Sequence, residues 1–135
     1  MDDFLVVLII INYNGQPHLK ECLDSVYMQT YAHFRVVVVD NNSTDNSLEI
    51  IKENYPQAKV IANKKNLGFG KAINQAIKDS LKDKPDFFGV LNNDIRLDKN
   101  WLYRLVQYAK GNPGAGILSG KILLYHWPKY VNSTG

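Results

Sequence analysis

Two runs of apolar residues, each followed at once by acid and amide residues, constrain this chain most strongly. The runs are VVVV at 36–39, followed by DNNSTD at 40–45, and FFGVL at 87–91, followed by NND at 92–94. Such runs are typical of strands that are buried on both faces of a parallel sheet. Ligands bind outside the carboxyl edge of such a sheet. The sequence therefore predicts a polar pocket to which both clusters contribute.

Extended and helical patterns alternate along the whole chain. Helices with one apolar stripe are expected after Pro17, after Asn46, after Gly70 and from Trp101. Strands are expected between and beyond them, at 5–11, 35–39, 59–62, 87–91, 115–118 and 122–125. This alternation predicts an α/β fold, a mainly parallel sheet with right-handed crossovers and helices on both faces, in three layers.

Length and composition exclude several classes of protein. A chain of 135 residues has room for one domain, 1–135, with a real core. Its net charge of +3 is too small to favour a nucleic-acid partner. The single cysteine, Cys22, falls on an apolar helix face, which favours a buried structural thiol and a reducing, cytoplasmic location. The apolar run at 4–11 is too short to span a bilayer.

The first polar cluster offers groups that suit a nucleoside. Asp40 could accept hydrogen bonds from an imide N–H of uracil or thymine, or from ribose hydroxyls. The same cluster could instead form a turn that caps a helix, and Asp45 fits that role. After the first strand, Tyr13 could stack on a base and the amides of Asn12 and Asn14 could bind it, although Asn14 equally suits a turn.

The segment 66–74 combines a glycine-containing loop with the start of a helix, which favours anions. Lys71 lies in the first helical turn and either assists a diphosphate or is an ordinary exposed lysine. The segment is not a dinucleotide fingerprint, because position 73 is Ile where a third glycine is needed. It is not a Walker A motif either, because Ala72 follows Lys71.

Four motifs together resemble one family. They are IIINYNG at 9–15, VVVVDNNSTD at 36–45, NLGFGKAIN at 66–74 and LNND at 91–94. In this order they are similar to the nucleotide-sugar-binding, N-terminal portion of family 2 glycosyltransferases, which have a GT-A fold, and to their rhamnosyltransferase-like members. The resemblance implies an inverting transfer from a UDP- or dTDP-sugar, with rhamnose a candidate, to a glycan or lipid-linked acceptor in polysaccharide or cell-envelope assembly. It implies donor contacts from Asn12, Tyr13, Asn14, Asp40, Asn42, Asn66, Gly68, Lys71 and Asn93.

The second polar cluster occupies the position of the metal motif of that family. By resemblance, Asp94 is the ligand of a Mg²⁺ or Mn²⁺ ion, which keeps several waters and binds through few protein carboxylates. Asn92 stands where many relatives have an aspartate, which removes one charge from the site. The competing interpretation is an Asx turn after a strand.

The resemblance does not supply a general base. In the family this base is an Asp or Glu downstream of the metal motif, and in this chain no carboxylate side chain follows Asp98. His126 could titrate near neutral pH, but its apolar Tyr-His-Trp-Pro context disfavours it. The catalytic residues are therefore unknown, and we expect a domain truncated at its C-terminus. The alternative is a catalytically incomplete donor-binding module that needs a missing C-terminal half. Homo-oligomerisation and peripheral binding at the inner face of a membrane stay open.

Overall fold

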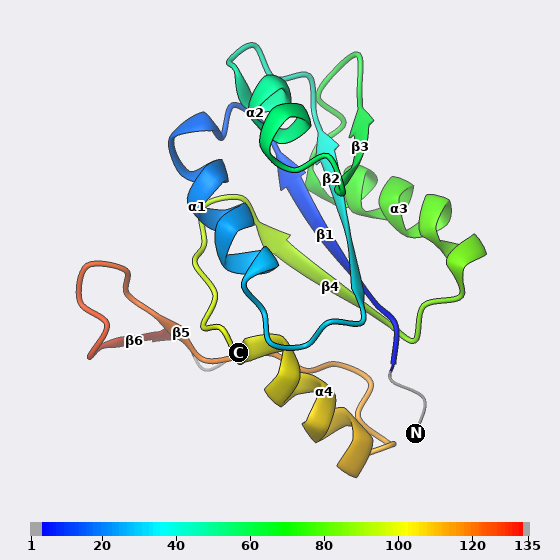
Figure 1. Ribbon diagram of the computed structural model, residues 1–135, viewed down its shortest axis with the longest axis vertical. Coiled ribbons are helices and arrows are strands. Elements are labelled where there is room, and N and C mark those ends of the chain that lie inside the picture. Colours follow the sequence, from blue (N-terminus) through cyan, green and yellow to red (C-terminus); the bar gives the residue numbers. More distant parts are fainter. Residues whose placement is uncertain (1–3, 134–135) are drawn as a thin grey trace.

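The computed structural model describes residues 4–133 as an α/β domain built on a parallel sheet (Figure 1). The four strands lie in the order β3-β2-β1-β4, and all neighbouring pairs are parallel. The strands are β1 (Val6–Asn12), β2 (Phe34–Asp40), β3 (Lys59–Ala62) and β4 (Phe87–Asn92). The predicted parallel sheet is thus confirmed, and the predicted bounds of these four strands lie within about one residue of the observed ones.

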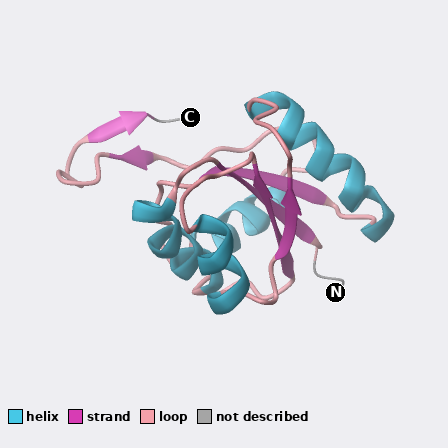
Figure 2. Cartoon of the chain, turned by 90° about the horizontal axis from the view of Figure 1, so that it is seen from above, coloured by secondary structure: helices cyan, strands magenta, loops and turns pink. Residues whose placement is uncertain are grey.

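Helices cover both faces of the sheet, which makes three layers (Figure 2). Alternate residues of β1 explain why: Leu8 and Ile10 face one core, whereas Ile9 and Ile11 face the other. The first core is completed by α1 (Gln16–Tyr27), α2 (Ser47–Asn54) and α4 (Trp101–Gly111), and the second by α3 (Phe69–Ser80). A single 3₁₀ turn, η1 (Leu81–Asp83), follows α3.

Strand β1 is the centre of the domain. All seven of its residues are buried, and it pairs with β2 on one side and with β4 on the other. Each fully buried aliphatic side chain contributes about 1.5–3 kcal/mol of hydrophobic free energy. Burial on both faces therefore fixes the register of β1, because a one-residue slip would exchange its two sets of side chains.

The register brings the two polar clusters to one edge of the sheet. Asn12, the last residue of β1, lies opposite Asp40 of β2, and Ile11 lies opposite Asn92 of β4. The turns that follow β1, β2 and β4 therefore meet at the carboxyl edge. This is the arrangement that the sequence predicts.

The part of the chain after α4 differs from the prediction. Residues 115–118 form no strand, and the second predicted strand is reduced to β5 (Ile122–Leu123), which pairs antiparallel with β6 (Val131–Ser133). This hairpin projects from the body of the domain (Figure 1) and forms no part of the main sheet. Its residues are largely exposed, including Trp127 at 64%. Apolar composition alone does not decide whether a segment forms a strand: the expected strand at 115–118 is wrong, and the one at 122–125 is confirmed only over Ile122–Leu123.

Candidate functional site at the carboxyl edge of the sheet

A buried asparagine connects the three turns at the carboxyl edge. Asn12 has no exposed surface, and its side-chain amide donates to Asp40 Oδ1 at 2.8 Å and to Ser43 Oγ at 3.1 Å. Its Oδ1 accepts a hydrogen bond of 2.9 Å from the side chain of Asn93. The side-chain NH₂ and Oδ1 of Asn12 are therefore both hydrogen-bonded to protein groups, and these bonds hold the turn after β4 against the turn after β2.

Asp40 is also completely buried. Besides the Asn12 bond, its Oδ1 accepts from Ser43 Oγ at 2.6 Å and its Oδ2 accepts from Ser43 N at 2.9 Å. Without exposed surface, Asp40 cannot contact a nucleoside directly in this conformation. The expected donor contacts of Asp40 and Asn12 stay a prediction; in this conformation both side chains are buried, and their hydrogen bonds hold the turns together. Sequence reasoning missed Ser43, although a hydroxyl three residues after a strand-end aspartate is a known turn signal.

The turn after β2 is held by two further side chains. Asn14 has a φ of 51°, and its Oδ1 accepts from Thr44 N at 2.8 Å, which agrees with its predicted role in a turn. Asp45 accepts from Gln16 N and from Ser47 N, both at 3.0 Å, and so caps the beginnings of α1 and α2. Desolvation acts to raise the pKa of Asp45, but the hydrogen bonds from Ser47 and Gln16 outweigh it and lower that pKa. The predicted capping role is confirmed.

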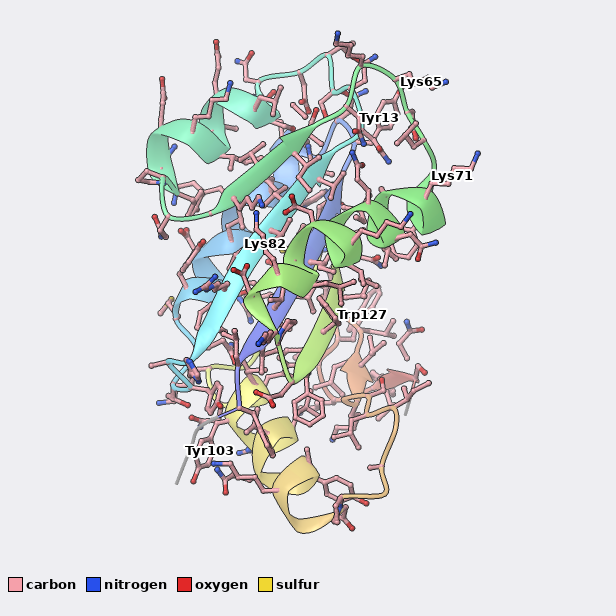
Figure 3. All side chains as sticks on the ribbon, turned by 90° about the vertical axis from the view of Figure 1, so that its right-hand side faces the viewer. Tyr13, Lys65, Lys71, Lys82, Tyr103 and Trp127 are labelled. Carbon is pink, nitrogen blue, oxygen red and sulfur yellow. The ribbon has the colours of Figure 1, made fainter. Side chains whose placement is uncertain are left out.

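Several predicted donor contacts do lie open to solvent around this edge. Tyr13 is 52% exposed, and Asn42, with a φ of 67°, is exposed beside it in the sheet-edge turns. Figure 3 shows Tyr13 at the same end of the molecule as Lys65 and Lys71. The exposed ring leaves Tyr13 free to stack on a flat ligand.

The start of α3 forms a second part of the edge. Gly68 occupies the N-cap with a φ of 79°, a value that favours glycine, and no side chain caps the helix there. Asn66 Oδ1 accepts from Gly68 N at 2.8 Å, and Lys71 is exposed in the first turn. Uncapped N–H groups at a helix start attract anions. The predicted anion-binding character of this segment thus has the geometry it needs.

An amide cluster that sequence reasoning missed lies at the base of this loop. Asn63 and Gln75 exchange two hydrogen bonds of 2.9 Å, and Asn63 also donates to Asn41 Oδ1 at 3.0 Å. Asn41 is 2% exposed. The three amides join the end of β2, the end of β3 and the middle of α3, and no short sequence motif connects residues so far apart.

The turn after β4 presents an acidic group to solvent. Asp94 is exposed and forms no hydrogen bond or ion pair with residues 4–133, whereas Asn93 is held by Asn12. The carbonyl of Asn92 accepts from the buried thiol of Cys22 at 3.4 Å. A Cβ at Gly15 would overlap Asn93 Nδ2 and Asn12 Oδ1, so α1 approaches this turn as closely as a glycine allows.

The protein ligands at this turn fit a divalent cation that takes most of its coordination from phosphate oxygens and water. Asp94 offers one free carboxylate, and the described residues contain no group of three or more His, Cys, Asp or Glu that could hold a metal alone. Mg²⁺ and Mn²⁺ suit such a site when phosphate oxygens and water complete their coordination. Cys22 adds no ligand, because burial raises the pKa of its thiol to about 12 and keeps it protonated, as the predicted structural role requires.

The projecting hairpin carries the weakest catalytic candidate, His126. Its ring is exposed and packs edge-on against Tyr125 and Trp127. The hydroxyl of Tyr125 donates to Glu21 Oε1 at 2.8 Å, which fastens the hairpin to α1. No hydrogen bond connects His126 to the polar turns among the described residues. The arrangement thus gives His126 no role at the edge.

Comparisons with known proteins agree with this geometry. The family model "Glycosyl transferase family 2" matches residues 7–127. The N-acetylglucosaminyl-diphospho-decaprenol L-rhamnosyltransferase of Mycobacterium tuberculosis is 34% identical over 126 residues, which cover 87% of this chain and 41% of that protein. No helix within residues 4–133 has the length and apolar character needed to cross a membrane.

Solved structures share the fold. S. aureus TarS 1-349 in complex with UDP has a TM-score of 0.73 at 23% identity, covering 90% of this chain and 42% of that one. The mannosyltransferase PcManGT from Pyrobaculum calidifontis, in complex with GDP-Man and Mn²⁺, has a TM-score of 0.69 at 25% identity, covering 77% of this chain and 32% of that one. The chain thus spans less than half the length of each of these three relatives. With its GT-A sheet and its family match over 7–127, the chain belongs to glycosyl transferase family 2.

Proposed function

We propose that this chain binds the nucleoside-diphosphate sugar donor of an inverting glycosyltransferase, with UDP- or dTDP-sugars as donors. The observation that carries the proposal is the meeting of three turns at one edge, where Tyr13, the start of α3 and Asp94 are all exposed around the buried bonds of Asn12. An exposed ring, free helix N–H groups and a free carboxylate match the base, the diphosphate and its counter-ion.

Each exposed group has a distinct role in this proposal. Tyr13 stacks on the base, and the amides of Asn14 and Asn42 bind its edge or the ribose. The free N–H groups in the first turn of α3, after Gly68, and the Lys71 ammonium lie against the diphosphate and stabilise the charge that develops as it leaves. Asp94 would hold a Mg²⁺ or Mn²⁺ ion, which supplies further neutralisation of that charge when bound.

The acceptor is proposed from the relatives. The name of the M. tuberculosis relative gives it a diphospho-decaprenol acceptor and an L-rhamnosyl group. We propose by analogy that this protein acts on a glycan or lipid-linked acceptor in cell-envelope assembly, at the inner face of a membrane, with rhamnose among the candidate sugars. Direct attack by an acceptor hydroxyl on the anomeric carbon inverts the configuration there and needs a general base.

A second candidate function rests on one observation. No carboxylate side chain follows Asp98, and the family reaction as we propose it needs an Asp or Glu there. The chain by itself is then a nucleotide-sugar-binding module that needs a further polypeptide to transfer sugar. A transfer assay with UDP-glucose, UDP-GlcNAc or dTDP-rhamnose and a polyprenyl-diphosphate acceptor separates the two, since only the first candidate releases nucleoside diphosphate.

Calorimetric titration tests the donor site directly. We expect UDP or dTDP to bind the purified chain more tightly with Mn²⁺ than without it, and we expect Asp94→Asn to remove this metal dependence. Glu53→Ala is a matched control, because Glu53 is an exposed carboxylate on α2 that forms no hydrogen bond or ion pair with residues 4–133. Absence of binding by both nucleotides, with and without Mn²⁺, would refute the proposal.

A further inference from the structure

The loop between β3 and α3, together with the first turn of α3, places three unpaired ammonium groups at the carboxyl edge. Lys64, Lys65 and Lys71 are exposed, and none forms an ion pair with residues 4–133. Figure 3 shows Lys65 and Lys71 on the same end of the molecule as Tyr13. The position of this loop therefore decides where a concentration of positive charge lies relative to the ligand.

Few bonds hold this loop in place. Strand pairing between β2 and β3 ends at Ala62, and the backbone N–H of Asn63 then donates to Asp40 O at 2.9 Å. Beyond that point, residues 64–67 make one hydrogen bond within the part of the chain that the structure describes: Asn66 Oδ1 accepts from Gly68 N. This bond is internal to the loop and does not tie it to the domain. A loop with so few bonds to the domain depends on the side chains at its two ends for its position.

Those side chains are Asn41, Asn63 and Gln75, which we call the amide clamp. Asn63 and Gln75 form two hydrogen bonds of 2.9 Å with each other, across the loop from its first residue to the second turn of α3. The other donor hydrogen of Asn63 goes to Asn41 Oδ1, and Asn41 Nδ2 donates to Gly68 O at 3.4 Å. The clamp thus ties both ends of the loop to the end of β2.

We propose that the amide clamp positions the β3–α3 loop for binding of the donor diphosphate. The inference rests on the proposed function and extends it to three residues that do not themselves touch the donor. A loop that is already ordered before binding loses less conformational entropy when it binds. The clamp therefore raises nucleotide affinity through the loop.

The reciprocal pair allows a test by exchange of side-chain length. Gln75→Asn and Asn63→Gln each change the separation of the two amides by one methylene, whereas the double variant Asn63→Gln/Gln75→Asn restores their combined length. We expect each single variant to weaken UDP binding in the presence of Mn²⁺ by about tenfold, since a loop that the two hydrogen bonds no longer hold must be ordered when the nucleotide binds. We expect the double variant to bind within about twofold of the wild type.

The control is Gln107→Ala, which removes an exposed glutamine of α4. Affinity is measured by calorimetry well below the unfolding midpoint of each variant, and hydrogen exchange of the bonded amides at the two loop ends, Asn63 N–H and Gly68 N–H, is followed in parallel. We expect faster exchange there in the single variants and wild-type exchange in the double variant. The affinity does not change if the clamp merely contributes to stability, because the folded fraction would then bind normally.

The outcomes separate the inference from the function on which it rests. A wild-type chain that binds neither UDP nor dTDP refutes the proposed function. A wild-type chain that binds, with single variants of unchanged affinity, overturns the clamp. So does a folded double variant that stays as weak as the single ones. Should either single variant fail to fold, Gln75→Met replaces it, since Met has a similar length and removes both hydrogen bonds without adding a charge.

Discussion

Replacing Asp40 by its amide tests whether the buried carboxylate holds the carboxyl edge together. Asn has the same shape as Asp, so Asp40→Asn leaves no cavity. Asp40 accepts hydrogen bonds from Asn12 Nδ2, Ser43 N and Ser43 Oγ, at 2.8, 2.9 and 2.6 Å. In either orientation, the new NH₂ group faces Ser43 N–H or the Asn12 amide, and at least one bond becomes a contact between two donors.

The size of the effect follows from these contacts. A hydrogen bond to a charged group contributes about 1.5–3 kcal/mol, and relief of the buried charge offsets part of its loss. We therefore expect Asp40→Asn to lower the free energy of unfolding by about 2 kcal/mol. The matched variant is Asp94→Asn, which makes the same chemical change at an exposed side chain that has no hydrogen bond with residues 4–133. Its expected effect is less than about 0.5 kcal/mol.

Urea unfolding followed by tryptophan fluorescence measures both variants, with the midpoint compared at constant slope. In a nucleotide titration with Mn²⁺, Asp94→Asn should be the more affected variant. It loses metal-dependent binding, whereas folded Asp40→Asn keeps part of it. Equal stability of the two variants would refute the structural role of the buried Asp40 carboxylate. Equal retention of metal-dependent binding would refute the role of Asp94 as a metal ligand.

Three further changes have defined outcomes. Gly15→Ala should lower the melting temperature by several degrees in thermal unfolding, since its Cβ overlaps the side chains of Asn12 and Asn93. Asp45→Ala should lower the unfolding free energy by about 1–2 kcal/mol in urea, because helices α1 and α2 both lose a cap. The Cys22 pKa is raised from 9.0 to about 12, so its contribution to stability is complete below pH 9 and declines as the pH rises toward 12. Urea unfolding should show that the free energy of unfolding falls less between pH 8 and pH 10 for Cys22→Ala than for the wild type.

The sheet could be predicted because burial leaves a clear pattern in the sequence. Strand β1 is buried on both faces, and its continuous aliphatic run has few other interpretations. Helix α1 similarly buries Leu19, Cys22 and Leu23 at the predicted spacing. The segment 115–125 has comparable apolar residues, but its pairing depends on a partner strand that sequence pattern does not identify.

The location of the candidate site could be predicted, but the exposure and the hydrogen-bond partners of its side chains could not. Parallel strands bring their carboxyl ends together, so the meeting of the two polar clusters follows from topology alone. Whether a side chain points into solvent or into the structure depends on its partners, and Asp40 is buried because Asn12 and Ser43 bind it. The pairing of Asn63 with Gln75 likewise depends on how α3 packs, which no local rule supplies.

The central position of β1 has a consequence for the order in which the domain assembles. The bond from Asn93 to Asn12 joins residues 81 positions apart, whereas Asn12 and Asp40 are 28 apart. Closing the longer loop is entropically harder and slower. The pairing of β1 with β2 should therefore form early, and β4 should dock late. A nascent chain synthesised only as far as α3 would carry Tyr13 and the β3–α3 loop without Asp94. The proposed metal-dependent binding would then require that β4 has closed the sheet.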